Sequence, residues 1–250
     1  LYMPYRGANH DEVQFVGTGS TSFDGTNDYV SVADDNTLDL VDHITICAWF
    51  KLDDTSNDNY AHIINKGDKY FIKQNGAAST LLVGFNDGSY RTATTEAFTE
   101  GKWHHVAMTY DEATIIPYLD GVAGTSTAIA STLSADSSAL IIGAGDASTN
   151  FWEGNIKNVA IWNRALTATE VQNVMYKTYA EVSGRLGDST LVAWWSLDGE
   201  VGSDGNAGSG YILDEVAGAG STTNLGTITN ATVDTDLYGG DTPVIPRAID

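Results

Sequence analysis

Carboxylates are the most numerous residues in this sequence that could do chemistry, with 33 aspartates and glutamates among 250 residues. Hydrolysis of a glycan needs two carboxylates that flank one bond, and a strand supplies them when acidic residues stand two apart on one face. No Glu-x-Asp-x-x-Glu run occurs, and the acidic pairs at 34–35, 53–54 and 111–112 are adjacent residues in turn-like sequence. Adjacent residues of an extended chain point to opposite faces. We therefore predict solvated turns, no catalytic residue and no enzyme activity.

The histidines and the cysteine form no recognisable catalytic or metal-binding motif either. The five histidines include one adjacent pair, His104 and His105, which a regular strand points to opposite faces, so the two cannot bind one metal ion together. The sequence has no Gly-x-Ser-x-Gly nucleophile turn, no His-Glu-x-x-His zinc helix and no phosphate-binding glycine loop. The single cysteine, Cys47, can form no intrachain disulfide, and we expect a small buried side chain there.

Aromatic residues beside polar loops offer a different chemistry, the stacking of a ring against the apolar face of a sugar. Tyr90 follows the turn sequence Asn-Asp-Gly at 86–88, and Trp152 follows a stretch rich in Ser, Thr and Asn. We predict Tyr90 and Trp152 as ligand-binding residues. The alternative is that these rings pack in the core or in an interface, where aromatic side chains bury the most area.

The composition excludes several classes of partner. Twelve basic residues against 33 acidic ones give a net charge of -21, and such a surface repels nucleic-acid phosphates and anionic lipid heads. No stretch approaches the ~20 apolar residues that cross a bilayer. A hydrophobic fraction of 42% nevertheless suffices for a packed core. We expect a folded protein that neither binds nucleic acid nor inserts into a membrane.

The elements that position these residues are short strands separated by clusters of Gly, Asn, Asp and Ser, a rhythm typical of an all-β sandwich. Alternation in residues 44–52 puts Ile44, Ile46, Ala48, Phe50 and Leu52 on one face and Thr45, Cys47, Trp49 and Lys51 on the other. We expect the first face to line the core between two sheets and the second to be largely covered as well. The Asn-Asp-Gly sequence at 86–88 and the Asp-Gly sequence at 120–121 predict hairpin turns.

One short helix is expected after residue 166. Thr167 and Glu170 have the three-residue spacing of a capping box. Val171, Val174 and Met175 then follow at helical spacing, so this helix should bury one apolar face.

Five segments in order resemble one known family. They are residues 23–30, 44–52, 63–67, a central hairpin at 103–111 and 118–121, and 154–167. Together they are similar to the laminin-G-like, concanavalin A-like lectin jelly rolls, a superfamily related to the pentraxins. The resemblance extends over roughly residues 20–178. It implies a two-sheet antiparallel jelly-roll sandwich that serves more often as a binding scaffold than as a catalyst.

The resemblance also implies where a calcium ion and a ligand would sit. Asp68 and Asp146 fall where pentraxin-like relatives carry loop ligands for calcium and for its glycan or phosphate-bearing partner. Asp24 lies in the opening strand, near where a structural calcium is sometimes held. Calcium prefers oxygen ligands from loops, so these aspartates are the candidate metal ligands. Lys157, in place of an acidic residue of the closing strand, argues against an adjacent cation.

The last third of the chain has a different composition. Residues 1–180 are predicted to form the jelly roll, and residues 181–250 a Gly-, Ser-, Thr- and Asp-rich extension with a strand at 191–198. That strand resembles one which precedes the opening strand in many relatives. Two alternatives follow: the extension completes the sandwich of its own chain in permuted order, or it joins a neighbouring subunit or module.

The function expected from these observations is that of a non-catalytic surface module in a virion or extracellular assembly. Its partners would be a glycan ligand and neighbouring subunits or structural proteins of that assembly. One alternative is a purely structural, self-assembling capsid or fibre protein. A second alternative is a glycoside hydrolase or lyase of the same fold.

Overall fold

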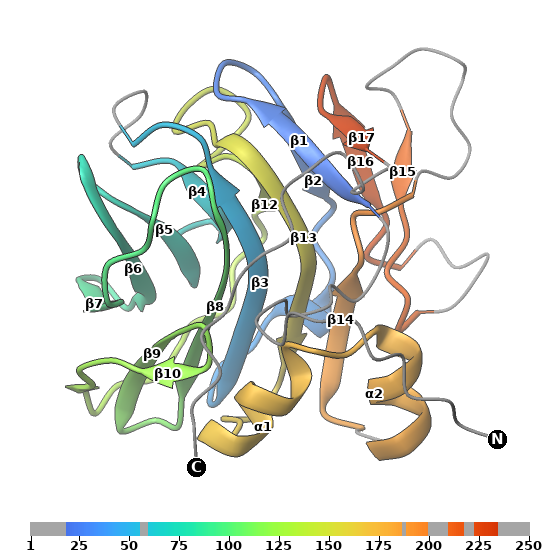
Figure 1. Cartoon of the computed structure of the whole chain (residues 1–250). Helices are drawn as coiled ribbons and strands as arrows, with labels where there is room; N and C mark the ends of the chain where they lie inside the picture. The colour runs from blue at the N-terminus through green and yellow to red at the C-terminus, as the bar shows by residue number, and fades with distance from the viewer. Residues whose placement is uncertain (1–18, 56–59, 187–188, 200–209, 218–222, 235–250) are drawn as a thin grey trace, which may run out of the picture.

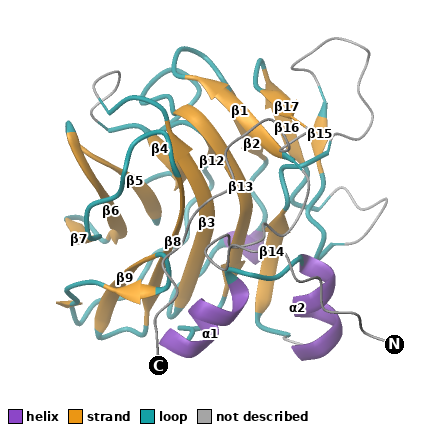
Figure 2. Ribbon diagram, in the orientation of Figure 1, coloured by secondary structure: helices purple, strands orange, loops and turns teal. Residues whose placement is uncertain are grey.

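The structure is a computed structural model, and it describes residues 19–55, 60–186, 189–199, 210–217 and 223–234. In these residues two antiparallel sheets pack face to face, with two short helices at one end of the sandwich (Figures 1 and 2). The predicted all-β jelly-roll sandwich is confirmed. None of the described helices is long and apolar enough to cross a membrane.

The first sheet has the strand order β10-β9-β8-β3-β13-β1-β17, with β11 paired to β9 and β14 paired to β13. Its strands are β1 (Ser20–Asp24), β3 (Ile44–Leu52), β8 (Trp103–Tyr110), β9 (Thr114–Leu119), β10 (Val122–Ala123), β11 (Thr127–Ala128), β13 (Glu153–Trp162), β14 (Leu191–Trp195) and β17 (Thr232–Asp234). The hairpin predicted at 120–121 joins β9 to β10, and both of its residues have the positive φ of a tight turn.

The second sheet has the order β15-β16-β2-β12-β4-β5-β6-β7. Its strands are β2 (Tyr29–Val32), β4 (His62–Lys66), β5 (Phe71–Asn75), β6 (Ala78–Asn86), β7 (Tyr90–Thr94), β12 (Leu140–Ile142), β15 (Tyr211–Ile212) and β16 (Gly226–Thr229). The hairpin predicted at 86–88 joins β6 to β7, in which Asn86 pairs with Tyr90. This hairpin places Tyr90 on the edge strand β7, and the Tyr90 ring reaches Phe71 of β5.

Strand β3 has the two faces that its alternation predicts. Ile44, Ile46, Ala48, Phe50 and Leu52 all belong to the core between the sheets. On the other face, Cys47 and Trp49 are buried too, because helix α1 (Ala168–Val174) and its neighbours cover the outside of the first sheet. The Trp49 indole donates a hydrogen bond to the carbonyl oxygen of Met175, 2.9 Å away, and so ties the end of this helix to the sheet.

Helix α1 begins with the predicted capping box. The Thr167 side chain accepts a hydrogen bond from the Glu170 amide, and the Glu170 carboxylate accepts one from the Thr167 amide. A second helix, α2 (Tyr179–Leu186), was not predicted. Thr178 and Glu181 make the same reciprocal pair of hydrogen bonds at its start, so the sequence does contain a signal for it. Val182 of α2 packs in the same outer cluster as α1.

The C-terminal extension pairs with strands of its own chain in this structure. β14 lies beside the second half of β13, β16 beside β2, and β17 beside β1 (Figure 1). Its apolar residues enter both clusters: Trp195 and Leu197 lie in the core between the sheets, and Trp194 lies in the outer cluster with Trp162. The extension and the first 180 residues therefore share their packing.

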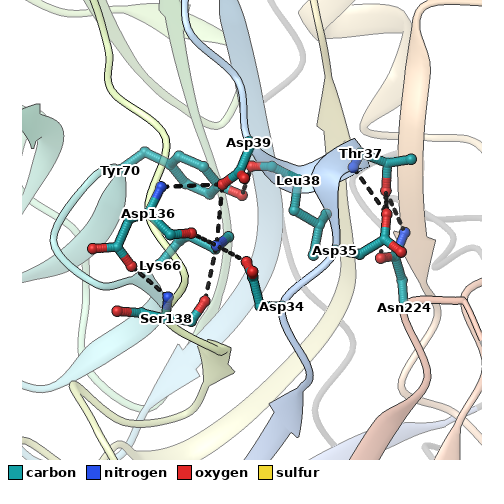
Figure 3. A network of polar contacts seen from close by, with 10 residues as sticks. All are labelled: Asp34, Asp35, Thr37, Leu38, Asp39, Lys66, Tyr70, Asp136, Ser138 and Asn224. Atoms are coloured by element: carbon teal, nitrogen blue, oxygen red, sulfur yellow. Dashed lines mark hydrogen bonds and ion pairs between the residues drawn. The ribbon is translucent and has the colours of Figure 1, made fainter.

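A buried lysine fixes the end of β4. The Lys66 ammonium lies 2.7 Å from a carboxylate oxygen of Asp34 and 3.4 Å from one of Asp39, and it also donates to the carbonyl oxygens of Asp136 and Ser138 (Figure 3). The Lys66 side chain is 1% exposed. These contacts join two loops, residues 33–43 and 129–139, to the end of β4, where the strand leads into the turn that carries Asp68.

Candidate binding face

The outer side of the second sheet carries a group of rings around one lysine. Ile72 points into the core between the sheets, so its strand neighbours Phe71 and Lys73 point to the opposite face. Tyr90 on β7 and Tyr60 just before β4 complete the group. We call Tyr60, Phe71, Lys73 and Tyr90 the aromatic patch.

The Lys73 ammonium lies among three rings. Its nitrogen is 4.6 Å from the centre of the Phe71 ring, 4.7 Å from that of Tyr90 and 5.7 Å from that of Tyr60. The Phe71 and Tyr90 rings meet edge to face at 5.8 Å. Phe71 is fully buried, whereas Tyr60 is 50% and Tyr90 55% exposed. The patch therefore has an apolar floor and two tyrosine rings open to solvent.

Asp68 fixes the position of Tyr90. It lies in the turn between β4 and β5 with a φ of 61°, and its amide donates to the Asn65 side-chain oxygen at 3.0 Å. The Tyr90 hydroxyl donates to the Asp68 carboxylate at 2.7 Å, and this hydrogen bond raises the pKa of Tyr90. An otherwise mobile exposed ring is thereby held in one orientation.

Asn65 connects this turn to the loop that contains Asp146. Its side-chain amide donates to the carbonyl oxygen of Gly145 at 2.6 Å, while its oxygen accepts from Asp68. Asn65 is buried, so both contacts are shielded from water. The two loop aspartates singled out by the family resemblance are thus held on either side of one asparagine.

His62 lies beneath the patch as a neutral ring. It is paired with Lys73 across β4 and β5 and makes a ring contact of 6.3 Å with Phe71. Burial, with the nearby Lys73 charge as the second cause, lowers the pKa of His62 to about 3, while the backbone of Tyr60 and the charge of Asp146 act in the opposite direction. His62 therefore adds no charge to the patch at neutral pH.

This burial predicts a pH effect on stability. In the unfolded chain His62 binds a proton near pH 6.5, but in the folded protein only near pH 3. Its contribution to stability is therefore complete above pH 6.5 and is lost as the pH falls towards 3. As the pH is lowered, we expect the free energy of unfolding of the wild type to fall more steeply than that of His62→Gln. The two slopes should differ by up to about 1.4 kcal/mol per pH unit. Urea unfolding at pH 7, 5.5 and 4 measures this difference, and equal slopes would contradict it.

The comparison with family models decides what kind of domain this is. The model described as the concanavalin A-like lectin/glucanases superfamily matches residues 24–172, more than half of the chain. The chain belongs to this superfamily. A search of curated proteins gives no match.

Solved structures of this superfamily's fold include three informative likenesses. A Bacteroides ovatus protein proposed to bind carbohydrate is 19% identical with a TM-score of 0.66, over 93% of this chain and 62% of its own. A heptameric pentraxin from Limulus polyphemus is 17% identical with a TM-score of 0.50; the match covers 65% of this chain and 84% of the pentraxin chain. The ligand-binding domain of botulinum neurotoxin serotype D, in complex with N-acetylneuraminic acid, is 17% identical with a TM-score of 0.51. This match covers 66% of this chain and 44% of the toxin chain. At these identities the likenesses show the fold alone, and the chain spans less than two thirds of the Bacteroides protein.

The structure separates the two predicted aromatic ligand-binding residues. Tyr90 is exposed in the aromatic patch, but Trp152 is fully buried in the core between the sheets. The Trp152 ring meets Phe50 edge to face at 5.8 Å, and its indole donates to the Lys51 carbonyl oxygen at 3.2 Å. No face of this ring is open to a ligand, so the prediction for Trp152 is corrected to the alternative, packing in the core.

The three predicted metal ligands do not come together. Asp68 accepts from Tyr90, Asp146 accepts from the amide and hydroxyl of Ser148, and Asp24 accepts from two amides of its own turn. Within the described ranges, no group of three or more His, Cys, Asp or Glu side chains is placed to hold a metal ion. Calcium takes six to eight oxygens, more than any one of these aspartates supplies. Calcium binding stays a prediction.

Tyr60, Lys73 and His62 were not predicted as parts of a site. The alternation of residues 71–75 would have placed Phe71 and Lys73 together on one face, a ring and a cation two residues apart. For Tyr60 and His62 the sequence contains no comparable signal, because their proximity depends on the pairing of β4 with β5.

Proposed function

We propose that the chain is a non-catalytic glycan-binding module that holds a sugar on the aromatic patch. The observation that carries this proposal is the pair of half-exposed rings, Tyr60 and Tyr90, on either side of the Lys73 ammonium. A tyrosine presents an apolar ring to a sugar and a hydroxyl to a polar partner. Here the Tyr90 hydroxyl donates a hydrogen bond to Asp68, and the Tyr90 ring stays exposed.

The rigidity of the patch supports binding. Holding a ring in its bound orientation before the ligand arrives reduces the entropy lost on association. The Asp68 hydrogen bond and the buried Phe71 ring hold Tyr90 in this way. The Bacteroides protein proposed to bind carbohydrate and the toxin domain in complex with N-acetylneuraminic acid share this fold, which is consistent with the proposal.

Replacement of Tyr90 by alanine should weaken glycan binding without affecting the fold. Loss of a central interface ring costs more than about 1.4 kcal/mol, which corresponds to roughly tenfold in affinity. A glycan array followed by titration of the bound sugars measures this loss. Tyr211→Ala is a matched control, because Tyr211 is 40% exposed and lies on β15, at the opposite edge of the same sheet.

The outcomes of this test are distinct. We expect Tyr211→Ala to bind as the wild type does and Tyr90→Ala to lose most of the signal. Equal binding by all three proteins would show that the sugar sits elsewhere. Repetition with excess chelator tests calcium separately, since binding by the patch alone should not change. Release of reducing sugar from a bound polysaccharide would contradict the non-catalytic assignment.

We also propose that the module works outside the cell, on an extracellular or virion assembly with neighbouring subunits. The heptameric Limulus pentraxin shows that the fold can assemble, and the acidic surface is compatible with that setting. Light scattering over a range of concentrations tests self-association. A strictly monomeric protein would leave only heterologous partners and would remove the alternative of a self-assembling capsid or fibre.

A further inference from the structure

We propose that the aromatic patch prefers acidic sugars and that Lys73 pairs with the sugar carboxylate. This inference rests on the proposed function and adds the chemical class of the ligand. It arises from the surroundings of the Lys73 ammonium, which differ from those of an ordinary surface lysine.

Among the described residues, the Lys73 ammonium has rings around it and no hydrogen-bond acceptor. Three ring centres lie within 5.7 Å of its nitrogen. Burial lowers the pKa of Lys73, and the nearby Asp68 carboxylate acts in the opposite direction without accepting a hydrogen bond from it. The side chain is half-buried, so the rings have displaced part of its water. An ammonium is a strong donor with three N–H groups. A ligand oxygen that bears a negative charge would satisfy it best, because charge-assisted hydrogen bonds are about twice as strong as neutral ones.

The rest of the patch matches the other parts of an acidic sugar. A hexuronate presents a carboxylate, neighbouring hydroxyl groups and an apolar ring face. Lys73 can donate to the carboxylate, and Asp68, whose second carboxylate oxygen is not used by Tyr90, can accept from a hydroxyl. The half-exposed rings of Tyr60 and Tyr90 can receive the apolar face of the sugar. A neutral sugar would use the rings and Asp68 but would leave Lys73 without an acceptor.

The strongly negative surface does not oppose this preference at physiological salt. The net charge is -21, but at about 0.15 M salt exposed charges more than roughly 8 Å apart are largely screened. A direct pair between Lys73 and a carboxylate lies well inside that distance. The charge of the whole chain therefore affects the approach of an acidic polymer more than its bound state.

Matched acidic and neutral ligands test the inference. Polygalacturonate and its carboxyl-reduced form have the same linkages and differ only in charge, and an array with sialylated and desialylated pairs widens the comparison. We expect the wild type to bind the acidic member of at least one pair about tenfold more tightly. Lys73→Gln should bind the two members of each pair equally, and Lys73→Arg should restore the preference for the acidic member.

Each result separates this inference from the proposed function. If Tyr90→Ala abolishes binding but wild type and Lys73→Gln show no preference between the paired ligands, the glycan site stands and the acidic preference is wrong. Tighter binding of the neutral members, or of an amino-sugar polymer such as chitosan, would also overturn the preference. Absence of binding to every acidic and neutral glycan would contradict both proposals.

Discussion

A chain that ends after residue 186 is expected to lose its cooperative fold. The deletion removes β14, β16 and β17, which pair with β13, β2 and β1. The core residues lost with them are Ala193, Trp195, Leu197, Ile212, Ile228 and Ala231. Removal of a single buried tryptophan side chain costs about 3–5 kcal/mol, against a total stability of about 5–15 kcal/mol for a typical protein. Circular dichroism during urea unfolding and light scattering measure the loss.

A chain that ends at Asp234 is the matched control for this truncation. It keeps every described strand, so it should unfold cooperatively as the full chain does. If the chain that ends after residue 186 is a folded monomer of full stability, the extension is a separate unit. If the full chain forms oligomers and that truncation abolishes them, β14 is donated to a neighbour, which is the alternative that the sequence left open.

Replacement of Lys66 by methionine should destabilise the protein by about 3–5 kcal/mol, which is the usual cost of removing one partner of a buried ion pair. The change leaves the Asp34 and Asp39 carboxylates and two carbonyl oxygens without the ammonium that they share. Methionine has a similar length, so lost packing contributes little. The free energy of unfolding in urea at pH 7 measures the effect.

Lys51→Met provides the matched control. Lys51 also lies near a carboxylate, 3.5 Å from Asp53, but both side chains are partly exposed. Exposed ion pairs contribute about 0–1 kcal/mol, so this variant should be nearly as stable as the wild type. Equal effects at the two lysines would contradict the structural role assigned to Lys66.

Much of the fold could be predicted because its signals are local. The alternation in residues 44–52 is sufficient to assign both faces of β3, and Thr167 with Glu170 specifies the start of α1. Helix α2 was missed although Thr178 and Glu181 repeat the same spacing. The partner of the strand at 191–198 could not be predicted, since the same residues could pair with β13 of the same chain or of another.

The candidate site was less predictable because it depends on strand register. Tyr90 was found because it follows a turn, but the same reasoning failed for Trp152, which also follows a polar loop although its ring is in the core. A ring beside a polar loop can point either way. Lys73 becomes part of the site only through the pairing of β5 with β4 and β6, which places it between Tyr60 and Tyr90.

The measurement that tests the central claim most directly is an NMR titration of the labelled full chain with the oligosaccharide that gives the strongest array signal. Glycan binding by the aromatic patch predicts that the largest amide shifts occur at Tyr60, Lys73 and Tyr90. It also predicts little change at Tyr211, on the far edge of the same sheet. Shifts confined to that far edge or to helices α1 and α2, with Tyr90 unchanged, would contradict the account.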